Sequence, residues 1–86
     1  MRIAGVHLDV SVARLLSEIL ERDGYPETAS RIEDAIERRI TVEAPLTVAD
    51  YEAISTVLDR NCPATLHRLH TELLEQQRRL RRITGE

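Results

Sequence analysis

Aromatic residues are scarce in this sequence and lysine is missing altogether. Tyr25 and Tyr51 are the only aromatics among 86 residues. Nucleic acid bases and flat ligands are often held by stacking on aromatic rings, so this chain offers them few platforms. All twelve basic residues are arginine, which we interpret mainly as a consequence of GC-rich coding. The core must be built from Leu, Ile, Val and Ala, a composition that suits packed helices.

Cysteine, glycine and long apolar runs are also in short supply. Cys62 is the only cysteine, which excludes an intrachain disulfide, and three glycines are too few for a phosphate-binding loop. No apolar run approaches the roughly 20 residues of a membrane span, and the first residues show no signal-peptide pattern. We therefore expect a cytoplasmic protein that neither enters a membrane nor carries a cofactor.

The charge that is present is unevenly distributed. Residues 1–59 carry twelve acids and six arginines, a net charge of −6, whereas residues 60–86 carry three acids and six arginines, a net charge of +3. A chain of this length forms one domain with a thin core, which oligomerisation can stabilise. We expect a single helical domain over residues 1–86, with an acidic body and a basic tail that favours an acidic partner or a second copy.

Two helices are predicted in the first half of the chain, forming a helical hairpin over residues 9–40. In the first, apolar residues recur at the spacing of one helix face, and Gly24 is suited to end it in a left-handed conformation. Pro26 suits the first turn of the second helix. The two apolar faces are Val12, Leu15, Leu16, Ile19 and Leu20, and then Ala29, Ile32, Ile36 and Ile40.

A linker over residues 41–46 follows, and two short segments show strand-like alternation. Apolar and polar residues alternate over residues 3–8 and again over residues 40–46. Pro45 confines the second segment to an edge or an extended connection. A short two-stranded pairing between the two segments is one interpretation of the pattern.

A second helical hairpin is predicted over residues 47–83. Thr47 and Asp50 have the spacing of a capping box, which marks the start of a helix that runs to Asn61. Pro63 then opens a last helix that continues to about Ile83. The fold class is therefore all-α, with two hairpins forming a small four-helix bundle.

The two hairpin corners use similar residues. The stretches "DGYPETASRIEDAI" and "RNCPATLHRLHTEL" align without gaps at an offset of 37. Pro26 aligns with Pro63, and Gly24 aligns with Asn61, which also tolerates positive φ. We expect both corners to turn in the same way.

Cys62, His67 and His70 are the candidates for a metal site or a reactive thiol. Zinc sites usually need four ligands in recognisable pairs, and this set has one cysteine and two histidines. Cys62 precedes a helix start, where the helix dipole favours a thiolate, but His67 lies about 140° around the helix from it. We interpret Cys62 as a turn residue and the histidines as flanking a helix interface.

Other catalytic patterns are missing. The sequence contains no G-x-S-x-G, no H-E-x-x-H and no P-loop. Its many carboxylates are expected on solvated helix faces beside arginines. We therefore predict that the protein is not an enzyme.

The last helix carries the strongest interaction pattern. Its apolar residues alternate at steps of three and four, which is the a/d spacing of a coiled coil, interrupted by one glutamine. The part near the corner is expected to pack on its own domain, and the distal part is expected to reach a partner. The predicted partner interface is Leu66, Leu69, Leu73, Gln76, Leu80 and Ile83.

Arginines near the end of the same helix support an alternative. A cluster of basic side chains can contact phosphates, although cations also favour a helix C-terminus without any ligand. The candidate contacts to an anionic partner such as a nucleic acid are Arg68, Arg78, Arg79, Arg81 and Arg82.

Three stretches resemble a group of small, uncharacterised helical proteins of actinobacteria. They are "LLSEILERDGYPETASRIEDAI", "LTVADYEAISTVLD" and "CPATLHRLHTELLEQ", within residues 10–77. The resemblance implies a bacterial, cytosolic origin and no assigned activity. Together with the charge pattern, it leads us to expect a homodimeric regulatory module that binds another protein, antitoxin-like or a phage-type modulator, with a nucleic-acid-binding regulator as the alternative.

Overall fold

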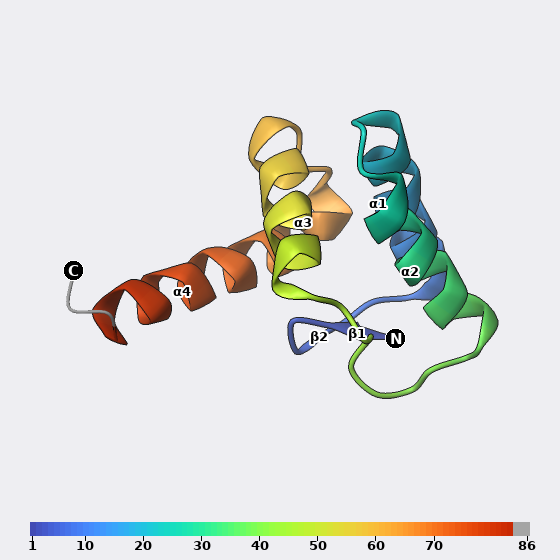
Figure 1. The fold of residues 1–86 in the computed structure, drawn as a ribbon, viewed down its shortest axis with the longest axis horizontal. Coiled ribbons are helices and arrows are strands. Elements are labelled where there is room, and N and C mark those ends of the chain that lie inside the picture. Colours follow the sequence, from blue (N-terminus) through green and yellow to red (C-terminus); the bar gives the residue numbers. More distant parts are fainter. Residues whose placement is uncertain (84–86) are drawn as a thin grey trace.

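The computed structural model describes the backbone of residues 1–83 and the side chains of residues 1–79 (Figure 1). The fold is mostly helical, as predicted, with four α-helices and a small antiparallel sheet near the N-terminus. In chain order the elements are β1 (Arg2–Ile3), β2 (Val6–His7), α1 (Val10–Arg22), α2 (Pro26–Glu37), α3 (Val48–Arg60), a 3₁₀ turn η1 (Ala64–Leu66) and α4 (His67–Ile83).

The first hairpin forms as predicted up to Glu37, where α2 ends; Arg39 has a φ of 53°, so Ile40, expected on the apolar face of the helix, lies outside it. Gly24 adopts a φ of 96°, a left-handed conformation that ends α1 and lets α2 begin at Pro26. The two helices pack side by side (Figure 1). Between them the buried Ser17 hydroxyl lies 3.2 Å from the Ala29 carbonyl oxygen and 3.1 Å from Glu33 Oε1. This donor therefore fixes α1 against α2 in addition to the apolar contacts.

The N-terminal extended segment pairs mainly with itself, which corrects the expected pairing of residues 3–8 with residues 40–46. Ala4 and Gly5 both have positive φ, so the chain turns back and β1 pairs with β2. The linker meets this hairpin at a bridge between Arg2 and Glu43, where the Ala44 N–H donates to the Arg2 carbonyl at 2.8 Å, and through the Glu43 carboxylate, which accepts from the Gly5 N–H at 3.1 Å. The linker is thus attached to the sheet's edge without forming a strand of its own.

The predicted start of α3 is confirmed. The Asp50 N–H donates to Thr47 Oγ1 at 3.2 Å, and the Thr47 N–H donates to Asp50 Oδ2 at 2.9 Å, which completes the capping box.

The second corner differs from the first, so the expectation of a repeated turn is wrong. Asn61 has a φ of −157° and is extended where the aligned Gly24 is left-handed. Pro63 is also extended and is followed by η1, so α4 begins at His67 and not at Pro63. The extra turn changes the direction in which the last helix leaves.

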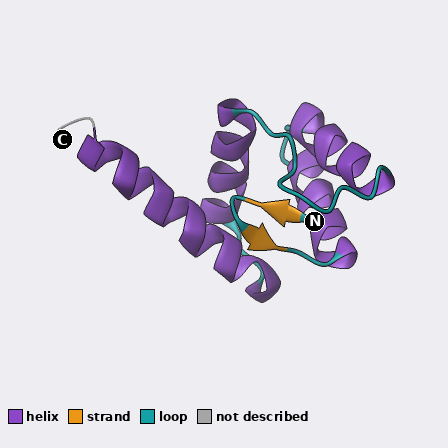
Figure 2. Cartoon of the chain, turned by 90° about the horizontal axis from the view of Figure 1, so that it is seen from below, coloured by secondary structure: helices purple, strands orange, loops and turns teal. Residues whose placement is uncertain are grey.

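As a result, the regular four-helix bundle is only partly realised. The helix α4 crosses the base of α3 and then projects away from the other helices (Figures 1 and 2). The molecule measures 40 × 26 × 23 Å, and its long dimension follows α4. One core joins the helices and the sheet, and its fully buried large residues are Ile3, Leu16, Leu20, Ile32, Ile54, Leu58, Leu66 and Leu69.

Candidate interaction surface on the C-terminal helix

The first half of α4 belongs to the protein's own core. Leu66 and Leu69 are fully buried and Leu73 is 3% exposed. These residues fill the space beneath α3 and α1, where the heptad spacing keeps them on one face. These three leucines belong to the predicted partner interface, but they are buried in the protein's own core and are not accessible to a partner.

Two glutamines attach the middle of α4 to the body. The Gln76 side-chain amide donates to the Ala4 carbonyl at 3.3 Å, and the Gln77 amide donates to Ser55 Oγ at 3.4 Å. Gln76 is the polar residue that interrupts the apolar pattern. The structure accounts for a glutamine at this position, because its side chain donates to a main-chain carbonyl within the same chain. That carbonyl belongs to the tight turn between β1 and β2 and is not part of the strand pairing.

His67 and His70, the two histidines near the second corner, have different surroundings. His70 Nε2 lies 2.7 Å from Asp59 Oδ1, and because a carboxylate only accepts, this nitrogen carries the proton. The contact joins α4 to the end of α3. His67 is exposed. Within residues 1–79, no group of three or more His, Cys, Asp or Glu side chains is placed to hold a metal ion.

The C-terminal part of α4 extends beyond the other helices and the sheet (Figure 2), and its backbone is helical to Ile83. Of the predicted anionic-partner contacts, Arg68, Arg78 and Arg79 are exposed. The side chains of Leu80, Arg81, Arg82 and Ile83 lie outside the described residues. Arg78 and Arg79 begin the last stretch of α4, residues 78–83, which we call the projecting segment.

A cleft lies where α4 diverges from α3. It has a volume of about 310 Å³, and Val48 at its α3 edge is 75% exposed, the most exposed large apolar side chain among the described residues. Sequence reasoning missed Val48, since it falls outside the apolar face of α3. We call this the α3–α4 cleft; its lining residues are Val48, Tyr51, Glu52, Ser55, Leu73, Gln76 and Gln77.

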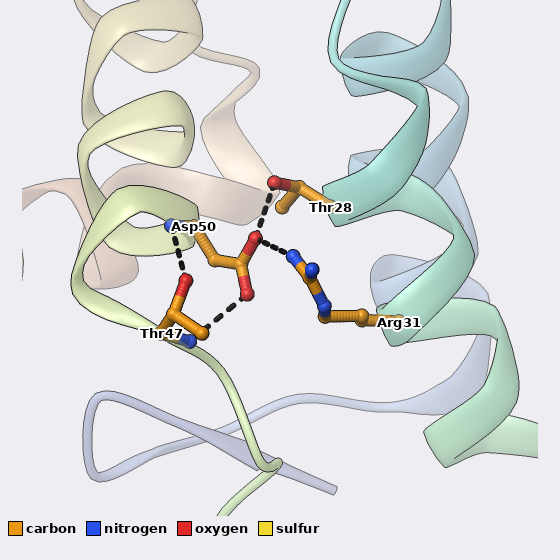
Figure 3. A network of polar contacts seen from close by, with 4 residues as sticks. All are labelled: Thr28, Arg31, Thr47 and Asp50. Atoms are coloured by element: carbon orange, nitrogen blue, oxygen red, sulfur yellow. Dashed lines mark hydrogen bonds and ion pairs between the residues drawn. The ribbon is translucent and has the colours of Figure 1, made fainter.

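Asp50 is the centre of a polar network that joins the two hairpins (Figure 3). It is 1% exposed, which corrects the expectation that the carboxylates lie on solvated faces. Besides capping α3, its Oδ1 accepts from Thr28 Oγ1 at 2.7 Å and from the Arg31 guanidinium, both on α2. One carboxylate therefore starts one helix and fixes the position of another.

The environment of Asp50 keeps it ionised. Burial raises the pKa of its carboxyl, but hydrogen bonds from Thr47 and Thr28 and the charge of Arg31 lower it, and the net pKa lies below the ordinary value. A carboxylate with its acceptor sites occupied and a lowered pKa is a poor general base. Its role is structural.

An open pocket of about 530 Å³ adjoins this network between α2 and α3. Its lining includes Arg31, Asp50, Glu27 and Glu52, so acids outnumber the one cation. Among the described residues, no buried side-chain nitrogen or oxygen lacks a hydrogen-bond partner. The pocket's buried polar groups are thus satisfied by the protein itself and require no ligand.

Cys62 has the properties of a turn residue. It is half-buried against the core, and its Sγ lies 3.6 Å from the Pro63 carbonyl oxygen. Burial raises the pKa of the thiol. The thiolate that a nucleophile needs is therefore disfavoured, although the position near a helix start pointed the other way.

Comparisons with known proteins add no relative. No known protein family, curated protein or solved structure matches the chain. Among the described helices, none combines the length and the apolar character that crossing a membrane requires.

Proposed function

We propose that this protein is a non-enzymatic interaction module that forms a homodimer through the projecting segment of α4, residues 78–83. The observation that carries the proposal is the departure of α4 from the body. Among the side chains of residues 1–79, the last on α4 that hydrogen-bond to the body are those of Gln76 and Gln77, and the backbone continues as a helix to Ile83.

The physical argument concerns the stability of that segment. A helix end of less than two turns gains little from its own hydrogen bonds and is marginal in water. In the sequence, Leu80 and Ile83 continue the heptad spacing of Leu69 and Leu73. Packing these two residues on another chain would stabilise both the helix end and a protein with a thin core.

A regulatory rather than a catalytic role accords with the state of the titratable groups. The buried carboxylate of Asp50 accepts three hydrogen bonds, and burial of Cys62 favours its thiol form. The lowered pKa of Asp50 and the raised pKa of Cys62 are accounted for by hydrogen bonds, an ion pair and burial within the fold. We propose that the module acts by occupying another macromolecule's surface, as antitoxin-like or phage-type modulators do.

Light scattering on the full chain and on a chain truncated after Gln77 tests the proposal. We expect a dimer for the full chain, and for the truncated chain a monomer with an unchanged core, monitored by far-ultraviolet circular dichroism. A full chain that is strictly monomeric, with a stability unaffected by the truncation, would overturn the proposal.

Nucleic acid binding is a second candidate, favoured by the exposure of Arg78 and Arg79 on the projecting segment. It predicts an affinity that falls steeply with salt and with Arg78→Ala plus Arg79→Ala. Arg14→Ala plus Arg22→Ala on the exposed face of α1 is the control with the same change in net charge. Absence of binding at low salt excludes this candidate.

A further inference from the structure

We propose that the α3–α4 cleft of each protomer receives residues 78–83 of the other, so that two α4 helices cross antiparallel and exchange their ends. The inference rests on the proposed homodimer and names where its contact segment binds.

The cleft has the apolar character that such a segment needs. Three apolar or aromatic side chains line it: Val48, which is 75% exposed, Leu73, which is 3% exposed, and the half-buried Tyr51 of α3. Covering exposed aliphatic surface contributes roughly 25 cal/mol per Å². The leucine and isoleucine of the sequence "RRLRRI" (residues 78–83) supply aliphatic side chains for this purpose.

The charges of the cleft and the segment are complementary. Glu52 lines the cleft and is exposed, and Glu43 is held beside it by accepting from the Tyr51 hydroxyl at 3.1 Å. The segment carries four arginines in six residues. An apolar floor with an acidic rim therefore matches an apolar stripe flanked by cations.

The protein's own α4 cannot deliver this segment to its own cleft. The helix is continuous from His67 to Ile83, and Leu80 lies about 6 Å farther along the axis than Gln76 at 1.5 Å per residue. The cleft is lined on α4 by Leu73, Gln76 and Gln77, which directly precede the segment on the same straight helix and leave it pointing away from the cleft. Only a second copy can supply residues 78–83 at that place.

Orientation follows from the distribution of charge along α4. A parallel pair would place the arginines of the two segments side by side. An antiparallel pair places them beside the half that carries Glu72 and Glu75, and beside Glu52 on α3. The contact is then the same on both protomers, as a two-fold dimer requires.

A matched pair of substitutions tests the cleft by sedimentation equilibrium. Val48→Arg places a cation at the mouth of the cleft, and Val10→Arg is the control, since each valine is an exposed first residue of a helix. We expect Val48→Arg to raise the dimer Kd at least tenfold and Val10→Arg to leave it within threefold. Equal effects of the two would overturn the assignment.

Charge exchange provides an independent test. It compares two different variants and their mixture, so it does not rely on a single substitution leaving the fold intact. Glu52→Arg alone and Arg81→Glu plus Arg82→Glu alone should each weaken their homodimer. An equimolar mixture should form heterodimers in preference, because the cleft with Glu52→Arg then meets the segment that has gained two glutamates, and the unaltered cleft meets the segment with four arginines. Random mixing would contradict the exchange of ends.

The outcomes separate this inference from the proposed function. A dimer that is lost on truncation after Gln77, yet is indifferent to Val48→Arg and to charge exchange, keeps α4 as the contact and removes the cleft. A strictly monomeric full chain removes both.

Discussion

The two helical hairpins have similar corner sequences and different geometry. In the first, α1 and α2 lie side by side along their length, whereas in the second α4 crosses α3 and leaves it (Figure 1). The difference begins at one position, where Gly24 is left-handed and the aligned Asn61 is extended. A turn of the backbone, and not the apolar spacing of the helices, decides whether a hairpin closes.

The polar contact across each hairpin is made at the same aligned position. Glu33 on α2 accepts from Ser17 on α1, and His70, its counterpart at the offset of 37, contacts Asp59 on α3. The first contact lies beside a buried hydroxyl in the middle of α1, and the second lies near the exposed end of α3. The second hairpin is therefore held near its corner and is open at the other end.

The largest expected effect tests whether the closed and the open hairpin share one core. Ile32→Ala in α2 and Leu69→Ala in α4 should each lower the free energy of unfolding by about 2–5 kcal/mol, since both side chains are fully buried. Leu74→Ala, at a side chain that is 37% exposed on α4, is the control and should cost much less. Urea unfolding measures all three. A small cost for Leu69→Ala would separate α4 from the core.

The next largest effect is expected at Asp50, whose polar network joins the two hairpins. Asp50→Ala removes the cap of α3 and the acceptor of Thr28 and Arg31, so we expect a loss of about 2–4 kcal/mol. Thr47→Ala removes only part of the cap and serves as the comparison, with a loss of about 1 kcal/mol. Equal losses in urea unfolding would mean that the links to α2 contribute nothing.

Acid should weaken the same joint. Because the folded pKa of Asp50 lies below its unfolded value, the folded state binds fewer protons, and this stabilisation is fully present above about pH 4. It is lost as the pH falls through the unfolded and then the folded pKa. Stability curves from pH 6 to pH 2 should therefore be less steep for Asp50→Asn than for the unaltered protein. Parallel curves would assign acid sensitivity to other carboxylates.

The corners themselves should respond differently to alanine. Gly24→Ala should cost about 1–2 kcal/mol because of its positive φ alone, since a Cβ at this position meets no atom within 4 Å. Asn61→Ala should change stability by less than about 0.5 kcal/mol, because its extended backbone suits any residue. Thermal unfolding compares the two. A similar loss of stability at both corners would instead support the prediction that the two corners turn in the same way.

The smallest effect concerns the contact near the open hairpin's corner. His70→Ala should cost about 0.2–1 kcal/mol, since its partner Asp59 is well exposed. His67→Ala, at an exposed neighbour, is the control and should be nearly neutral. A larger loss for His70→Ala would show that this contact, and not the buried leucines, holds α4 in place.

Much of the local structure was predictable because its signals lie close together in sequence. The capping box of Thr47 and Asp50 spans three residues, and the apolar spacing of α1 and α2 defined both helices to within a few residues. The links from Asp50 to Thr28 and Arg31 span 22 and 19 residues. These links depend on how the two hairpins pack. The helix cap was therefore predictable from the sequence, whereas the contacts of Asp50 with α2 were not.

The direction of α4 was not predictable for a different reason. Asparagine tolerates positive φ but does not require it, so Asn61 was compatible with either corner. The heptad spacing correctly predicted that Leu66, Leu69 and Leu73 lie on one apolar face. These three leucines proved to be buried in the protein's own core. The exposed Val48 and the cleft beside it arise only from the crossing of two helices.

The bond between Gln76 and the Ala4 carbonyl has a consequence for how the chain folds during synthesis. It joins residues 72 positions apart, and α4 also packs on β2. The first hairpin can close as soon as Glu37 has left the ribosome, because its contacts are local. The β-turn at residues 4–5 must wait until Gln76 has been made before the Ala4 carbonyl finds this donor. The turn therefore reaches its final contacts later than the first helical hairpin does.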